Sequence, residues 1–211
     1  MVVEAPHLRS DAARNLERIL EAARVAFAAE GLDASVADIA DRAGVGTATI
    51  FRRFATKDDL AAAILERELE RIAEQARAAA EAPDPAAALA AFMAWAIERF
   101  IADRCLCELG GSPLLNRASI HELTHEITAR LGELVRRGQK AGVLRKDIVA
   151  EDIGFLISGI GHVGARLEPV APGTWRRYVT IALDGLRSDG ATRLRQGPPT
   201  PQQVIAAKSA S

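Results

Sequence analysis

The segment 35–54 constrains the fold most, because its pattern predicts two short helices joined by a tight glycine turn. Ser35 is a favourable N-cap residue, and Asp38 follows it at close to capping-box spacing. Gly44 stands where the first helix must end, because glycine adopts the left-handed conformation of a helix C-terminus at little cost. A second helix can begin at Gly46. The pattern therefore predicts a helix-turn-helix, which presents one helix to the DNA major groove, and the alternative is an ordinary helix hairpin.

The residues of this segment divide into an inward and an outward set. The inward set consists of apolar side chains at helical spacing, namely Val36, Ile39, Ala40, Ala43, Ile50 and Phe54. Arginine and lysine suit phosphate contacts and threonine suits short polar contacts, so we expect the second helix to read DNA. The residues expected to contact DNA are Ser35, Thr47, Ala48, Thr49, Phe51, Arg52, Arg53 and Lys57.

Charge is distributed unevenly in this part of the chain. The first 60 residues carry eight Lys or Arg and ten Asp or Glu, so the region is mildly acidic by count. The stretch 42–57 nevertheless contains four cations and no acid, and groove binding needs only a local positive face. We therefore expect the nearby acids to point away from the duplex, namely Glu17, Glu21, Glu30 and Asp33.

Three flanking motifs extend the pattern on both sides of the turn. They are Arg18-Ile-Leu-Glu-Ala-Ala, Phe27-x-x-x-Gly31 and Thr56-Lys-Asp-Asp-Leu60. With them, residues 14–65 resemble the tetracycline-repressor (TetR) family of one-component transcription regulators. Beyond this part of the chain, only the length and the helical character agree with the family.

The resemblance implies a homodimer that binds a near-palindromic operator, usually as a repressor. It also implies a larger C-terminal domain that binds a small molecule and then releases DNA. The chain departs from the family pattern at two positions. Phe51 replaces a common tyrosine, so the phosphate contact of that hydroxyl is lost, and Ala48 replaces a common glycine or proline at the start of the recognition helix.

The whole chain is expected to be all-α and to contain two domains. It has 211 residues, of which 49% are hydrophobic and only 4% aromatic, which favours a helical globular protein. We expect a DNA-binding domain over 1–55, an effector-binding and dimerisation domain over 56–187, and a flexible tail over 188–211. After a disordered arm over 1–11, helices are expected at about 11–30, 56–82, 85–100, 119–141, 151–167 and 174–187, with a loop at 110–113.

Small residues form a stripe along the expected helix 151–167. They are Gly154, Ser158, Gly161 and Ala165, spaced four, three and four residues apart. Because glycine weakens a helix by roughly 1 kcal/mol, close packing must offset its presence. We expect this helix and the last one to pair across a twofold axis into a four-helix bundle. The alternative is close packing within one subunit.

Candidate effector contacts lie mainly on the apolar helix that begins at Pro85. Aromatic residues could line an apolar cavity, with arginine or histidine orienting the ligand. The candidates are Phe92, Trp95, Arg99, Phe100, His125 and His162. They suggest an apolar or aromatic effector, and the alternative is that the aromatic side chains are plain core.

A competing motif, His121-Glu-Leu-Thr-His125, matches the zinc-protease pattern. On a helix the two histidines would share a face, with Glu122 as a general base. The further histidine of the extended motif is missing, although Glu151 or Asp152 could supply a third ligand. We expect no enzyme and no cofactor, with zinc hydrolysis and a helical protein-binding adaptor as alternatives.

The remaining observations concern redox chemistry and location. Cys105 and Cys107 point to different sides of a helix, which disfavours a mutual disulfide, and we interpret them as small core residues. The alternative is a thiol-sensing role. The longest wholly apolar run, 86–97, is too short to span a bilayer, and no leader pattern opens the chain. We therefore expect a cytoplasmic protein without a membrane partner.

Overall fold

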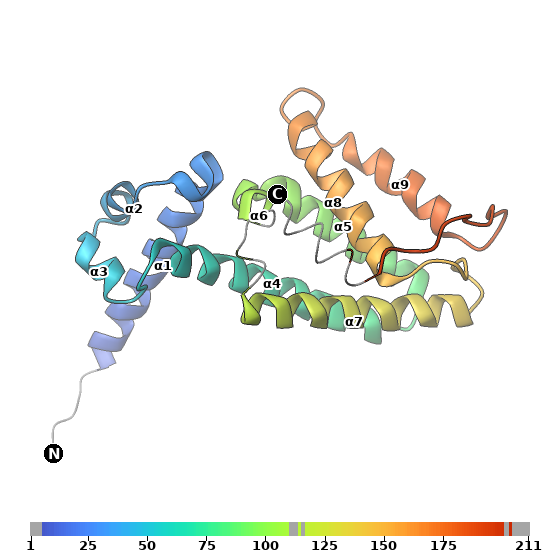
Figure 1. The fold of residues 1–211 in the computed structure, drawn as a ribbon, viewed down its shortest axis with the longest axis horizontal. Helices are drawn as coiled ribbons and strands as arrows, with labels where there is room; N and C mark the ends of the chain where they lie inside the picture. Colours follow the sequence, from blue (N-terminus) through green and yellow to red (C-terminus); the bar gives the residue numbers. More distant parts are fainter. Residues whose placement is uncertain (1–5, 110–113, 115–116, 201–202, 204–211) are drawn as a thin grey trace, which may run out of the picture.

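The protein is built from helices alone in the part described by the computed structural model, residues 6–109, 114, 117–200 and 203. Figure 1 shows α1–α3 at one end of an elongated molecule and α5, α8 and α9 at the other. This architecture confirms the all-α prediction. The helices are α1 (Pro6–Glu30), α2 (Val36–Ala43), α3 (Thr47–Phe51), α4 (Lys57–Glu81), α5 (Pro85–Ala102), α6 (Arg104–Leu109), α7 (Ala118–Lys140), α8 (Ala150–Leu167) and α9 (Trp175–Leu186), with a 3-10 turn, η1 (Gly31–Asp33), after α1.

Two elements differ from the sequence-based expectation. The expectation of a disordered arm up to residue 11 was wrong from Pro6 onward, since α1 begins at that residue. Proline is well tolerated in the first turn of a helix, which explains this start. The six-residue helix α6 was missed because it is too short to show a period. The expected loop at 110–113 lies outside the described residues.

Side-chain caps fix where the two central helices begin. At α4, the Asp59 amide donates to the Thr56 hydroxyl at 3.1 Å, and the Thr56 amide donates to the Asp59 carboxylate at 3.0 Å. This reciprocal pair is the capping box that the sequence predicted. At α5, the Asp84 carboxylate accepts the amides of the first turn, and Pro85 occupies the first helical position. The break between α4 and α5 is therefore specified locally.

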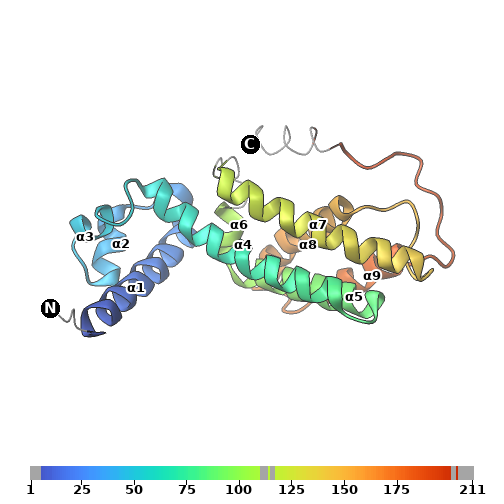
Figure 2. The same cartoon turned by 90° about the horizontal axis from the view of Figure 1, so that it is seen from below.

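The helix α4 connects the two ends of the molecule. Figures 1 and 2 both show its first turns beside α1–α3 and its later turns running alongside α7. In the C-terminal part, α5 packs against α8, and α9 lies outside this pair. The apolar core there includes Leu89, Met93, Leu134 and Ile153.

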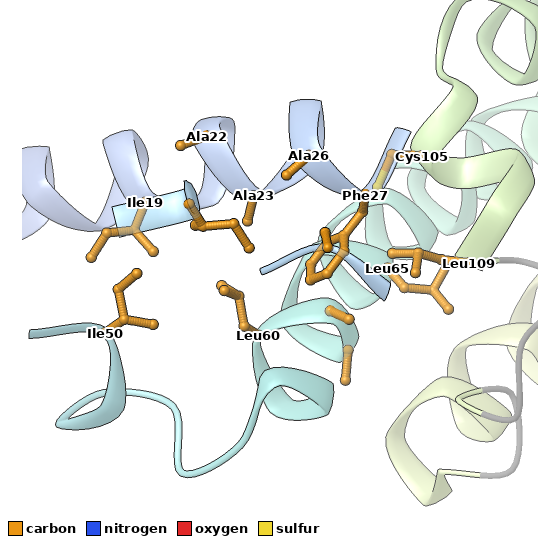
Figure 3. Close-up of a cluster of buried hydrophobic side chains, with 14 of the residues drawn as sticks. Ile19, Ala22, Ala23, Ala26, Phe27, Ile50, Leu60, Leu65, Cys105 and Leu109 are labelled. Atoms are coloured by element: carbon orange, nitrogen blue, oxygen red, sulfur yellow. The ribbon is translucent and has the colours of Figure 1, made fainter. Parts of the chain in front are cut away.

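The core of the N-terminal helices continues into α6. Ile19, Phe27 and Leu60 pack in one buried cluster with Cys105 and Leu109, as Figure 3 shows. The Cys105 side chain is buried, as expected for a small core residue, whereas the side chain of Cys107 lies outside the described part. The first three helices therefore share a core with α6, which begins about fifty positions after α3 ends.

Two further segments bear on the sequence-based expectations. By length and composition alone α5 could cross a membrane, and no other helix among the described residues could. Met93 and Ile97 are fully buried in the protein, which is typical of a core helix in a helical bundle.

After α9, the Ser188 amide donates to the Val143 carbonyl and the Leu194 amide to the Asp147 carboxylate, so hydrogen bonds hold the first part of the expected tail.

Candidate DNA-binding surface and interdomain cavity

The turn between α2 and α3 has the geometry of a helix-turn-helix. The Ser35 hydroxyl accepts the Ala37 amide at 3.2 Å and so caps α2. Gly44 ends α2 with φ 63° and ψ 41°, in the left-handed region. The Val45 amide then donates to the Ala40 carbonyl at 3.0 Å, which closes the turn. Backbone hydrogen bonds and one glycine therefore set the angle between the helices.

The helix α3 presents most of its side chains to solvent. Its only buried residue is Ile50, while the Phe51 side chain is 49% exposed. No hydrogen bond or ion pair engages the Arg52 or Arg53 side chain among the described residues. The expected DNA contacts are exposed at Ser35, Thr47, Ala48, Phe51, Arg52 and Arg53 and half-buried at Thr49 and Lys57. Figure 1 places α3 at the tip of the molecule, away from the C-terminal helices.

Two of the nearby acids are paired with arginines. Glu17 accepts Nη1 of Arg67 at 2.7 Å, and Glu21 accepts Nη2 of Arg24 at 2.8 Å. The hydrogen bond from Arg24 lowers the pKa of Glu21. Both carboxylates thus lie beside positive charges of α1 and α4, which offsets their repulsion of a polyanion.

The aromatic candidates for effector binding lie in the packed interior or on the surface of the C-terminal part. Phe92 is buried in the core, with the Trp95 ring centroid 6.2 Å from its own. Phe100 packs against His162 with ring centroids 4.9 Å apart, and His125 is exposed on α7. The structure does not bring these side chains together around one cavity. Of the six candidates, only Arg99 lines the cavity described next.

That cavity lies between the two ends of the molecule and has a volume of about 340 Å³. Its walls come from α1, α4, α5 and α6, so we call it the interdomain cavity. Eight charged side chains contribute to the walls: Glu17, Glu21, Arg24, Arg67, Glu68, Arg71, Arg99 and Asp103. The apolar part consists of Leu20, Ile64, Leu65, Ala102, Cys105, Leu106 and Leu109.

Two buried carboxylates organise this cavity. The side chains of Glu68 and Asp103 are only 9% and 8% exposed. Glu68 accepts from Arg99 at 2.6 Å through one oxygen and from Arg71 at 3.1 Å through the other. Sequence reasoning missed both carboxylates, although Glu68 was visible as a charge on the apolar side of α4, four residues after Ile64.

The zinc-protease motif lies on the surface of α7. His121, Glu122 and His125 are all exposed. Within the described ranges, no group of three or more His, Cys, Asp or Glu side chains could hold a metal ion. Glu151 and Asp152, at the start of α8, therefore do not complete such a site.

The stripe of small residues on α8 faces partly inward, which corrects the interpretation that the whole stripe forms a dimer interface. A Cβ atom at Gly161 would lie 2.7 Å from the Phe100 ring, and one at Gly164 would lie 2.6 Å from Ile101. These glycines therefore serve the close packing of α8 on α5 within the subunit, and Gly161 is buried and does not belong to an outward dimer surface. Ser158 and Ala165 are half-buried, and only Gly154 is exposed with open space around it.

A different face of α8 and α9 is apolar and exposed, and sequence reasoning missed it. On α8, Phe155 and Val163 are 54% and 57% exposed, and on α9, Tyr178 and Ile181 are 45% and 55% exposed. On α8, Phe155, Gly159 and Val163 recur every four residues, which is the periodic signal that could have revealed the face. Large exposed apolar side chains gathered on neighbouring helices are typical of an interaction surface.

An exposed helix-turn-helix, joined through a long helix to a larger helical domain, defines a DNA-binding transcription regulator of the one-component class. Family models match both parts of the chain. Residues 19–64 match the model described as bacterial regulatory proteins, tetR family, and residues 84–188 match the model described as transcriptional regulator SbtR-like, C-terminal domain. No curated protein matches the chain.

Solved structures agree with the family models. The TetR transcription regulatory protein from Mycobacterium vanbaalenii is 36% identical, with 85% of this chain and 99% of that chain covered and a TM-score of 0.59. The TetR transcriptional regulator SCO0520 from Streptomyces coelicolor is 30% identical, with 83% and 99% covered and a TM-score of 0.60. FadR from Bacillus subtilis, solved in complex with stearoyl-CoA, shares the fold at 17% identity, with 81% and 98% covered and a TM-score of 0.65.

The chain belongs to the TetR family of transcriptional regulators. It is therefore a non-enzymatic helix-turn-helix DNA-binding regulator with a ligand-binding C-terminal domain. This membership sets aside the zinc hydrolase and the protein-binding adaptor as alternatives.

Proposed function

We propose that the protein is a repressor that binds a near-palindromic operator as a homodimer and is released by a small molecule. The observation that carries this proposal is the exposed helix α3 together with the turn that follows it, in which Arg52 and Arg53 have no intramolecular partner among the described residues. Arginines held out in this way supply phosphate contacts, and Thr47 and Thr49 supply short polar contacts to base edges. Phe51 can pack on a sugar or a thymine methyl group.

The proposed dimer forms through the exposed apolar face of α8 and α9. Phe155, Val163, Tyr178 and Ile181 supply its apolar area. Gly154, which has open space around it, allows a partner helix to approach closely. Pairing of the same face on both subunits gives a twofold axis and a four-helix bundle. The two α3 helices then enter successive major grooves of a palindromic site, with half-sites about 34 Å apart.

Release from DNA follows from linkage between effector and operator. An effector that binds more tightly to a dimer whose α3 spacing does not match the grooves lowers operator affinity by the same factor. The stearoyl-CoA bound to B. subtilis FadR is a precedent for a small molecule with an apolar part, and we propose an effector of that general character here. We also propose a cytoplasmic location, where operator DNA is accessible.

The experiment is a gel shift on DNA selected by the protein from a random pool. We expect a retarded complex of one dimer on a near-palindromic site, with much weaker binding by the Arg52→Ala, Arg53→Ala double variant. A matched control, the Arg130→Ala, Arg136→Ala double variant, makes the same charge change on α7, distant from α3. Equal binding by both double variants would remove α3 from the DNA interface and overturn the proposal.

A further inference from the structure

The interdomain cavity combines a charged wall with an apolar wall. Arg67, Arg71 and Arg99 line it from α4 and α5, while Leu20 and Leu106 line it from α1 and α6. Its volume of about 340 Å³ falls in the range of small-molecule sites, at the small end. A ligand that fits must therefore be small and must match both walls.

The two buried carboxylates of the cavity are engaged by protein groups through both of their oxygens. Both oxygens of Glu68 accept arginine N–H groups, from Arg99 and from Arg71. Asp103 accepts the amides of Cys105 and Leu106 through Oδ1, and its Oδ2 lies 3.4 Å from Arg24. The charges of the buried acids are thus already paired with arginines of the protein.

The arginines, in contrast, retain unused donors. In the described part of the structure, Arg67 bonds through Nη1 alone, to Glu17, and Arg71 bonds through Nη1 alone, to Glu68. Their side chains are 42% and 52% exposed. Each guanidinium has five N–H donors in a planar fork that fits a carboxylate. The cavity therefore offers unused guanidinium N–H donors to an incoming group.

We propose that the interdomain cavity binds a small organic monocarboxylate, whose carboxylate contacts Arg67 and Arg71 and whose apolar part lies against Leu20 and Leu106. The bound anion lowers DNA affinity, because it competes with Glu17 for Arg67 and adds a negative charge beside Glu17 and Glu21 of α1. Those two acids belong to the helix that packs on α2, so their repulsion displaces the helix-turn-helix. The effect on DNA affinity rests on the proposed DNA-binding function, whereas the binding of the carboxylate to the cavity does not.

The first test is calorimetry on the full-length protein without DNA. The probes are hexanoate and octanoate, with hexanamide and octanamide as neutral analogues and hexylammonium as a cation. We expect the carboxylates to bind and the other probes not to bind. The Arg71→Gln variant should bind the carboxylates about tenfold more weakly, the effect of one charged hydrogen bond. Glu68 keeps its contacts with Arg99 in this variant, so the fold is retained.

The matched control is Arg130→Gln on α7. Like Arg71, Arg130 pairs with a glutamate three residues away, but it does not line the cavity. Its carboxylate affinity should equal that of the unmodified protein. Absence of carboxylate binding at millimolar concentration, equal binding of the amides, or equal weakening in both variants would overturn the site.

The second test measures fluorescence anisotropy of a labelled, selected operator. Octanoate should weaken DNA binding by the unmodified protein and have about a tenfold smaller effect on Arg71→Gln. Carboxylate binding without a change in DNA affinity would overturn the coupling. If the ligand-free protein selects no DNA, the proposed function is wrong, and calorimetry still tests whether the interdomain cavity binds carboxylates.

Discussion

Arg24 of α1 lies 3.4 Å from Asp103, measured from Nη1 to Oδ2, and the other oxygen of Asp103 accepts the first amides of α6. One carboxylate thus caps a helix of the C-terminal part and pairs with a helix of the DNA-binding part. The side chain of Asp103 is buried, which strengthens its electrostatic interactions. This contact is a direct link between the two ends of the molecule.

The link predicts different results for two substitutions of Asp103. Asp103→Asn keeps a capping oxygen but loses the charge, so it should lower the free energy of unfolding. Asp103→Ala also loses the cap and should cost about 1 kcal/mol more. Urea denaturation measures both. Asp84, an exposed N-cap of α5 without an ion pair in the described part, is the control, and Asp84→Asn should be close to neutral. A neutral Asp103→Asn would contradict the role of the ion pair.

The salt dependence of operator binding should identify the phosphate contacts made by Arg52 and Arg53, at the C-terminal end of α3. Each phosphate contact releases about one counterion per subunit on binding, so Arg52→Ala or Arg53→Ala should flatten the slope of log affinity against log salt by about that amount. Anisotropy titrations at several salt concentrations give the slope. Arg130→Ala on α7 should leave it unchanged. An unchanged slope in both the Arg52 and the Arg53 variant would exclude these arginines from the interface.

Gly44 should resist substitution by any residue with a side chain. Its φ of 63° costs about 1–2 kcal/mol for an L-residue, and a Cβ atom would lie 2.5 Å from the Arg18 guanidinium. Gly44→Ala should therefore lower the midpoint of thermal unfolding. Gly46 has an extended conformation and open space, so Gly46→Ala should have a smaller effect. Equal losses in the two variants would argue against a backbone origin.

A charge on the exposed face of α8 and α9 should dissociate the proposed dimer. Phe155→Asp or Ile181→Asp places a carboxylate where the apolar side chains of two subunits would meet, and burying it unpaired is costly. Sedimentation equilibrium should show a shift to monomer. Val143→Asp, an exposed apolar position in the turn after α7, should leave the mass unchanged. A persistent dimer in both face variants would place the interface elsewhere.

Asp147 should hold the segment after α9 over a wide pH range. It accepts Arg145 Nε at 2.7 Å and the Leu194 amide at 2.9 Å, and Arg145 lowers its pKa well below the usual 3.8. Because the pKa of Asp147 is lower in the folded than in the unfolded state, its ionised form stabilises the structure above pH 3.8. This contribution disappears only as the pH falls through the pKa of the folded state. Protection of the Leu194 amide from hydrogen exchange should therefore persist near pH 4.

The control for this segment is a second carboxylate with a backbone contact. Asp147→Ala should expose the Leu194 amide to exchange, whereas Asp152→Ala, which loses a contact with the Val149 amide, should not. Rapid exchange of Leu194 in the unmodified protein at neutral pH would refute the anchoring.

The local elements were predictable because their signals are local. Ser35, Gly44 and the Thr56–Asp59 capping box specify helix ends through contacts within a few residues, and the structure has each of them. The alternation of buried and exposed residues on α3 likewise follows from helical spacing alone.

The interdomain cavity and the face of α8 were decided only by tertiary structure. Arg24 and Asp103 are remote in sequence, and nothing in the pattern indicates that α6 packs on α1. Gly161 lies inward because Phe100 of α5 fills the space beside it, whereas Phe155 remains outside. Sequence by itself predicted most of the helices, though not the short α6, and the helix-turn-helix segment that we expect to contact DNA. Which helix faces meet depended on packing between distant segments, because burial is a property of the assembled chain.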